Sequence, residues 1–172
     1  NGILLIADEV IPAFGRTGAW TGSRLWGVRP DFTCTAKAIT NAYFPFGAVM
    51  IAEGVAQVFE GDETGKAAIG HGYTYSGHPV GAAAALVCLA ETERLNVKDN
   101  AGLRGQELYQ GLLALQAKYD AIGDVRGGHG LMCAIEMVAD RATKKPADKV
   151  APARVQAAAY QAGAMVRVSG PN

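Results

Sequence analysis

An aspartate and a lysine near the start of the chain each follow a short run of strand-forming residues. Asp8 comes directly after the apolar run 3–7, and Lys37 follows the run 32–35 after one alanine. The chain between the two runs is long enough for one right-handed crossover, so we expect the two strands to be parallel. Parallel strands end at one edge of a sheet, where open α/β folds bind their ligands. Asp8 and Lys37 are therefore expected to serve one ligand.

A carboxylate and an amine at one sheet edge suit the cofactor pyridoxal phosphate. A lysine amine can hold the aldehyde of this cofactor as a Schiff base, and a carboxylate can keep its pyridine nitrogen protonated. The spacing alone leaves alternatives open. Asp8 could simply cap the turn after its strand, and Lys37 could be a solvated surface lysine. The apolar neighbours Ala36, Ala38 and Ile39 favour instead a partly desolvated place for the Lys37 amine.

Five segments share a pattern that extends over much of the chain. They are LLIADEV at 4–10, FGRTG at 14–18, PD at 30–31, AK at 36–37 and HGYTYSGHP at 71–79. In order and spacing they resemble the class III (omega) aminotransferases. The resemblance implies an α/β fold, the fold type I of pyridoxal-phosphate enzymes (aspartate aminotransferase-like). It further implies that the chain holds part of the large, mostly parallel-sheet domain and the start of the small C-terminal α/β domain.

The resemblance also assigns roles to individual residues. Lys37 would carry the cofactor and then act as acid and base in a 1,3-proton shift, while Asp8 would bind the pyridine nitrogen. Val10 would pack against one face of the ring. Tyr73 and Thr74 would reach across a dimer interface, with the Thr74 hydroxyl and backbone N–H binding the phosphate in the other subunit. These five residues form the predicted site, and no metal belongs to it.

The function implied is transfer of an amino group from an omega-amino acid or primary amine to a keto acid, with pyruvate as acceptor. The protein would be a cytoplasmic homodimer or higher oligomer with shared active sites. An aminomutase or decarboxylase on the same scaffold is an alternative, and so is a fragment whose motifs are inherited but idle. A P-loop nucleotide-binding domain is a further alternative, although its Gly-x-x-x-x-Gly-Lys-Ser/Thr loop does not occur in these residues.

Composition excludes several classes of partner. Sixteen basic and sixteen acidic residues balance, so no bulk charge draws the chain to nucleic acid or a membrane surface. The cysteines and histidines show no metal-ligand spacing, and an odd number of cysteines fits reduced thiols better than disulfides. The cysteines are Cys34, Cys88 and Cys133, and the histidines are His71, His78 and His129. No long uninterrupted apolar span is present.

The chain reads as an internal piece of a longer protein, with no starting Met. We expect residues 1–119 to be the C-terminal part of the large domain with an interdomain helix, and 120–172 to be the start of the small domain. In the first part we expect an antiparallel strand 47–52, a short helix 54–59, a helix 80–95 with Pro79 in its first turn, and a helix to about residue 119 capped by Asp99 or Asn100. In the second part we expect a turn-rich segment 124–128 that leads into a strand 131–138. A polar loop 139–147, a helix 148–162 and a strand 164–168 are expected to follow.

Three further features lie near the predicted site. Pro12-Ala13 and Asn41-Ala42 stand where class III members often have glycines, which is expected to alter the border of the substrate pocket. His71 and His78 are interpreted as residues that hold their loop, and Arg16 and Arg126 as parts of turns rather than substrate clamps. By the same resemblance, the phosphate cup and the ring-stacking aromatic would precede residue 1. The arginine for the substrate carboxylate would follow residue 172.

Overall fold

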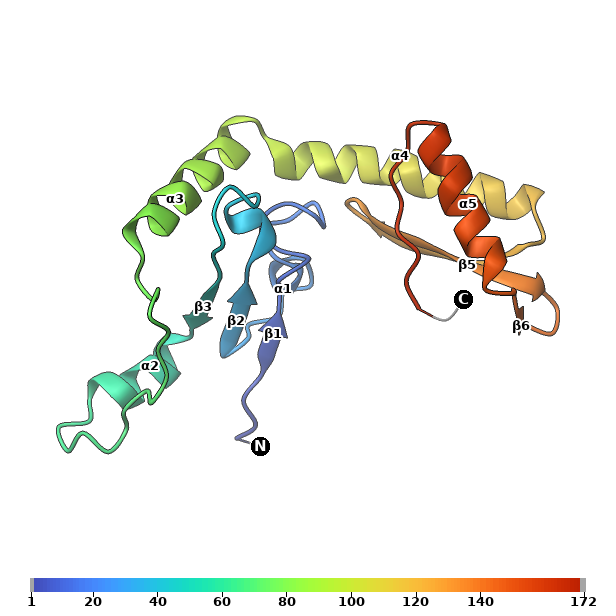
Figure 1. Cartoon of the computed structure of the whole chain (residues 1–172). Helices are drawn as coiled ribbons and strands as arrows, with labels where there is room; N and C mark the ends of the chain where they lie inside the picture. Colours follow the sequence, from blue (N-terminus) through green and yellow to red (C-terminus); the bar gives the residue numbers. More distant parts are fainter. Residues whose placement is uncertain (1, 171–172) are drawn as a thin grey trace. The chain divides into compact units, whose positions relative to one another are not determined.

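The computed structural model describes residues 2–170 and has an α/β architecture (Figure 1). The chain divides into two compact units, Asn1–Leu103 and Arg104–Asn172. The division falls within the long helix α4 (Val97–Lys118). The domain boundary predicted between residues 119 and 120 stays a prediction.

The first unit is built on a three-stranded sheet in the order β1-β2-β3. Strand β1 (Ile6–Asp8) pairs in parallel with β2 (Phe32–Thr35), and β2 pairs antiparallel with β3 (Ala48–Ile51). Both predicted strand directions are therefore confirmed. The second follows from chain length, because the short connection from β2 to β3 cannot hold a crossover helix.

Short helices connect these strands. Helix α1 (Gly22–Leu25) lies between β1 and β2, and its N-cap Thr21 accepts a hydrogen bond from the Arg24 N–H at 3.1 Å. The 3₁₀-helix η1 (Lys37–Ile39) follows β2. Helix α2 (Glu53–Glu60) follows β3, close to the predicted short helix, and leads into an exposed loop.

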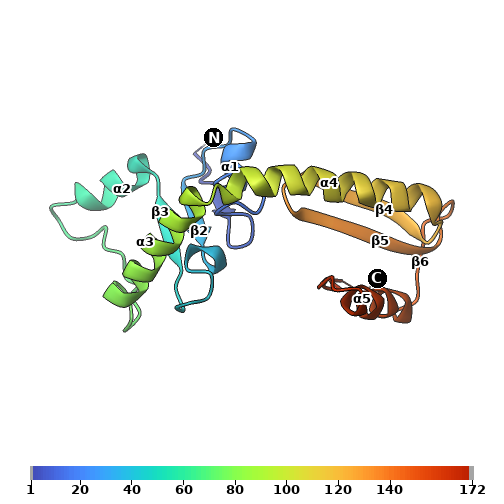
Figure 2. The ribbon, with the colours of Figure 1, turned by 90° about the horizontal axis from the view of Figure 1, so that it is seen from above.

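Helix α3 (Pro79–Arg94) begins with proline at its first position, as predicted. It contacts η1, and Figures 1 and 2 show it passing over the end of the sheet at which β2 leads into η1. Gly81, Ala85 and Thr92 are its buried residues, whereas Leu86 is 70% exposed. This alanine-rich helix is therefore only partly covered by the chain itself.

The start of α4 differs from the prediction. Asp99 and Asn100 do not cap the helix but lie inside its first turns, since α4 begins at Val97. Asn96 adopts a left-handed φ of 50° between α3 and α4, and its carbonyl accepts from the Asn100 N–H at 3.1 Å. Asparagine tolerates this backbone conformation better than most residues, so the chain passes from one helix to the next through two residues, Leu95 and Asn96.

The second unit contains a β-hairpin and a helix. Strands β4 (Ile122–His129) and β5 (Met132–Asp140) are antiparallel, and β6 (Lys145–Pro146) pairs with β5. In the view of Figure 2 the hairpin lies between the residues of α4 that belong to this unit and α5 (Val150–Gln161). The predicted strand 131–138 and helix 148–162 correspond to β5 and α5.

Three predictions for the second unit are wrong. Segment 124–128 is part of strand β4, because Gly127 and Gly128, with φ of 153° and 89°, form an irregularity within the strand rather than a turn. The predicted loop 139–147 contains β6. Segment 164–168 is not a strand, since none of the described strands pairs with it; its Val166 carbonyl accepts from the Gln156 side chain at 2.9 Å instead. No helix of the described part of the chain is long and apolar enough to cross a membrane.

Candidate active site

Asp8 and Lys37 lie at the same edge of the first sheet. Asp8 is the last residue of β1 and pairs in register with Cys34, which is followed by Thr35, Ala36 and then Lys37 at the start of η1. Both side chains are exposed. Parallel pairing of β1 with β2 thus places a carboxylate and an amine at the carboxyl ends of neighbouring strands, as the sequence predicts.

The two oxygens of the Asp8 carboxylate differ in their hydrogen bonding. Its Oδ1 accepts a hydrogen bond from the Val10 N–H at 3.1 Å, so it does cap the turn after its strand. No hydrogen bond joins Oδ2 to another of the described residues. One oxygen therefore fixes the side chain, and the other can bind a cationic or N–H donor group.

Lys37 adopts a backbone conformation that is unusual for a residue with a Cβ atom. Its φ is 48°, in the left-handed region, which costs roughly 1–2 kcal/mol. Thr40 holds the following turn: it is 1% exposed, and its hydroxyl donates to the Phe44 carbonyl at 2.7 Å. Such strain collects at functional sites, where the surrounding structure maintains it. The strain supports a special role for Lys37, although the expected desolvation of its amine is not found within this chain.

Two pairs of residues, Pro12-Ala13 and Asn41-Ala42, stand where the resemblance to the class III pattern leads one to expect glycine. Asn41 and Ala42 have φ of 49° and 64°, so they adopt the left-handed conformation that glycine would adopt without strain. Ala13 is 2% exposed and belongs to the core. Asn41 and Ala42 thus occupy backbone positions that suit glycine, and Ala13 contributes to the core.

Glu9, directly after Asp8, is a residue whose importance the sequence reasoning missed. Its side chain is buried and accepts hydrogen bonds from the Gly22 and Ser23 N–H groups at 2.8 and 2.6 Å and from the Ser23 hydroxyl. The signal that could have found it is the alternation of side chains in extended chain, because Glu9 directly follows the last residue of β1 and is expected to face away from Asp8.

Tyr73 and Thr74 lie in an exposed loop before α3. The Tyr73 N–H donates to the Ser76 hydroxyl at 2.9 Å, and the His71 ring meets the Tyr73 ring edge-on at 4.6 Å. His78 lies 5.1 Å from the Phe44 ring, centroid to centroid. These ring contacts agree with the interpretation that the two histidines hold their loop. Among the described residues, no hydrogen bond or ring contact joins this loop to Asp8 or Lys37.

Arg126 is occupied by neighbouring carboxylates. Its guanidinium donates to Glu136 at 2.6 Å and to Asp124 at 2.8 Å, and these hydrogen bonds raise the pKa of Arg126 above its ordinary value. A guanidinium engaged in this way is a strand-to-strand link. This supports the interpretation that Arg126 is not a substrate clamp.

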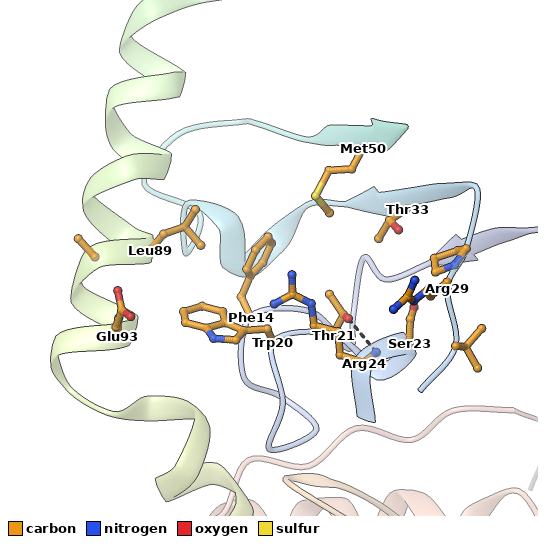
Figure 3. A pocket seen from close by; sticks show the side chains of 13 residues that line it. Phe14, Trp20, Thr21, Ser23, Arg24, Arg29, Thr33, Met50, Leu89 and Glu93 are labelled. Carbon is orange, nitrogen blue, oxygen red and sulfur yellow. Dashed lines mark hydrogen bonds between the residues drawn. The ribbon is translucent and has the colours of Figure 1, made fainter. Parts of the chain in front are cut away.

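A pocket of about 710 Å³ lies in the first unit, lined by residues of α1, β2, β3 and α3 and the loops around them (Figure 3). Arg24 and Arg29 line it together with Trp20 and Glu93. None of the five predicted site residues lines this pocket. In the described part of the chain no group of three or more His, Cys, Asp or Glu residues could hold a metal ion.

The family model for aminotransferase class III matches residues 1–172 of this sequence. The chain belongs to the class III aminotransferases. This membership rules out the P-loop nucleotide-binding domain considered as an alternative. Pyridoxal phosphate is the cofactor of the family, and the fold is fold type I.

Relatives of this class III chain agree with the match. It is 41% identical to the diaminobutyrate–2-oxoglutarate transaminase of Halomonas elongata and 42% identical to the taurine–pyruvate aminotransferase of Bilophila wadsworthia. These alignments cover 96% and 95% of the chain but 35% and 36% of the relatives. The crystal structure of an amine transaminase from an uncultivated Pseudomonas species, in its PLP-bound form, has a TM-score of 0.92 and 45% identity over 99% of this chain and 38% of that one. The chain thus spans about a third of the length of the proteins it matches.

The side chains at the sheet edge fit pyridoxal phosphate. The cofactor needs an amine for its aldehyde and an acceptor for its pyridine N–H. Lys37 provides an exposed amine, and Asp8 provides a carboxylate oxygen without a hydrogen-bond partner among the described residues. Asp8 ends β1 and Lys37 follows the parallel strand β2, so the class III chain offers one group of each kind that the aldehyde and the pyridine N–H need.

Proposed function

We propose that the full-length protein is a pyridoxal-phosphate-dependent aminotransferase that moves an amino group from an omega-amino acid or primary amine to pyruvate. The observation that carries the proposal is the pairing of β1 with β2, which brings Asp8 and the strained Lys37 to one sheet edge. Membership of class III supports the reaction type. Among the relatives, one name contains pyruvate and another 2-oxoglutarate, so the acceptor has to be tested directly.

In the proposal, each of a few residues serves a different part of the cofactor. The cofactor, when bound, supplies an electron sink for the substrate carbon. The Lys37 amine holds the cofactor until the substrate amine takes its place. It then acts as base and acid in the 1,3-proton shift, taking the proton from the substrate carbon and returning it to the cofactor carbon. The Asp8 carboxylate accepts a hydrogen bond from the pyridine N–H and keeps it protonated. Val10, two residues further on, covers one ring face.

The proposal includes a shared site in a cytoplasmic homodimer or higher oligomer. Thr74, with Tyr73 beside it, would bind the cofactor phosphate of the partner subunit. The support is that this loop is exposed and leads directly into α3, whose Leu86 and Val87 are 70% and 63% exposed. Residues 1–119 would belong to the large domain and 120–172 to the small one.

The lysine assignment is tested by chemical trapping. Borohydride reduction of the full-length holoenzyme, followed by peptide mapping, should place the pyridoxyl mass on Lys37. Lys66, in the exposed loop after α2, is the matched control. Lys37→Ala should abolish the visible absorbance band of the bound cofactor, and Lys66→Ala should retain it. Label on Lys66, or on no lysine, would contradict the proposal.

The acceptor is tested by comparing keto acids at equal concentration. With a primary amine as donor, kcat/KM for pyruvate should exceed that for 2-oxoglutarate. A larger value for 2-oxoglutarate would overturn the choice of pyruvate and leave the transaminase proposal intact.

A further inference from the structure

Glu9 is the one charged side chain among the described residues that is buried, with 3% of its surface exposed. Burial of a carboxylate is unfavourable unless hydrogen-bond donors replace the lost water. Here the donors are two backbone N–H groups and one hydroxyl, all from Gly22 and Ser23 at the start of α1. This burial is achieved by the chain itself, so further protein around it would not expose the group.

The contact joins α1 to the end of β1. A helix of four residues does not persist alone, because nucleation is unfavourable, so α1 depends on anchors. Gly22 suits the anchor: a Cβ atom there would lie 3.3 and 3.5 Å from the two Glu9 carboxylate oxygens and 3.1 Å from the Trp26 ring. Glu9 and α1 are thus fitted closely to each other.

The main chain of Glu9 is fixed as firmly as its side chain. Its N–H donates to the Cys34 carbonyl at 2.9 Å, and its carbonyl accepts from the Ala13 N–H at 3.0 Å. Asp8 lies directly before this point, and the Val10 N–H that orients the Asp8 carboxylate lies directly after it. Any rotation of the backbone at Glu9 would therefore move both partners of the Asp8–Val10 hydrogen bond.

We propose that Glu9 is a positioning residue for Asp8: its buried hydrogen bonds to α1 set the direction in which the Asp8 carboxylate meets the pyridine nitrogen of the cofactor. Strand alternation makes the arrangement possible, since Glu9 is anchored on the inner side and leaves Asp8 on the site side. The inference rests on the proposed function, because it presumes that Asp8 binds the cofactor.

The test compares three variants of the full-length holoenzyme. Glu9→Gln keeps the side-chain shape but replaces one acceptor oxygen by an amide NH2 group, which then faces another hydrogen-bond donor. Ser23→Ala removes the hydroxyl donor alone. Thr21→Ala is the matched control, since it removes the N-cap hydrogen bond of the same helix to the Arg24 N–H and has no hydrogen bond with Glu9. The readouts are the visible absorbance band of the bound cofactor, its pH titration, and the rate of the half-reaction with amine donor.

Glu9→Gln should shift the midpoint of the pH titration by about half a unit or more and slow the half-reaction at least tenfold, with the cofactor still bound. Ser23→Ala should change the titration midpoint and the half-reaction rate in the same direction by a smaller amount. Thr21→Ala should leave the midpoint unchanged and the rate within twofold of wild type. A wild-type titration and rate in Glu9→Gln would overturn the inference, as would equal changes in Thr21→Ala, which would show that only the stability of α1 matters. If Glu9→Gln is insoluble, Ser23→Ala decides by the same criterion.

The variant Asp8→Asn separates this inference from the proposed function. If Asp8→Asn alters the band and its titration but Glu9→Gln does not, the positioning role of Glu9 is wrong and the role of Asp8 stands. If Asp8→Asn itself leaves band, titration and rate unchanged, the proposed role of Asp8 fails, and the inference drawn from it fails too.

Discussion

Two adjacent carboxylates, Asp8 at the end of β1 and Glu9 directly after it, meet different surroundings because neighbouring residues of an extended chain face opposite sides. Glu9 is buried against the N–H groups of α1, whereas Asp8 is exposed and accepts one hydrogen bond, from Val10. Charge alone does not distinguish them in the sequence. The exposed Asp8 is therefore accessible to a ligand, whereas the buried Glu9 links the end of β1 to α1.

Asp8→Asn should therefore abolish most of the activity of the full-length enzyme. Asparagine keeps the shape of the side chain but loses the charge that holds the pyridine nitrogen protonated, so kcat should fall by about 10³-fold or more, as for other preorganised electrostatic groups. Steady-state kinetics with cofactor content measured in parallel provide the check. Glu63→Gln, in the exposed loop after α2, is the control and should keep wild-type activity. An Asp8→Asn enzyme within a few-fold of wild type and still loaded with cofactor would contradict the role.

At the scale of elements, the contact between α4 and the β4–β5 hairpin in the second unit depends on a glycine. Gly105 on α4 is so close to Gly130 that a Cβ atom would overlap the Gly130 carbonyl group. The Gln106 side chain donates to the Gly128 carbonyl at 2.6 Å, next to the same turn. The far end of α4 is held by Arg141, whose guanidinium donates to the carbonyls of Gln116, Tyr119 and Ile122.

Gly105→Ala should destabilise the protein, whereas Gly111→Ala on the same helix should not. Overpacking against backbone costs about 1–3 kcal/mol, and the higher helix propensity of alanine offsets about 1 kcal/mol of it. At Gly111 nothing lies within 4 Å of an added Cβ, so only the propensity gain of about 0.5–1 kcal/mol applies. Thermal unfolding followed by circular dichroism should give a lower midpoint for Gly105→Ala and an equal or higher one for Gly111→Ala. Equal midpoints for the two variants would refute the close packing.

At the scale of the whole molecule, the chain leaves large apolar side chains uncovered. Ile3, before β1, is 84% exposed, Ile6, in β1, is 64% exposed, and Leu86 of α3 is 70% exposed. The apolar run 3–7 is thus not buried by this chain. Exposed apolar surface of this kind is typical of interaction sites, and the chain spans about a third of its relatives. The proposed shared site depends on such an interface.

Mixed dimers test whether Thr74 acts across that interface. Thr74→Ala should weaken cofactor binding by about 1–3 kcal/mol, because a charged acceptor loses a donor. When full-length subunits carrying Lys37→Ala are mixed with subunits carrying Thr74→Ala, a shared site collects both defects in one site of each mixed dimer and leaves the second site intact. Activity should then exceed that of either variant alone. If mixed dimers form but show no recovery, Thr74 acts within its own chain and the shared-site proposal is wrong.

Features that depend on local pattern and on chain length could be predicted from the sequence alone. The run 32–35, the helix beginning at Pro79 and the parallel pairing that places Asp8 beside β2 follow from composition, from a proline at a first helical position, and from the chain needed for a crossover. The family motifs add the expected roles of Asp8 and Lys37.

Features that depend on partners distant in sequence could not be predicted in this way and are seen in the three-dimensional structure. Glu9 is buried because α1 returns to it from residues 22 and 23, and Gly127 lies within a strand because β5 pairs alongside it. Segment 164–168 has strand-forming composition but no neighbouring strand among the described residues, so its backbone bonds elsewhere. A strand, a buried charge and a strained backbone each require hydrogen bonds from other segments, and local sequence does not contain those partners.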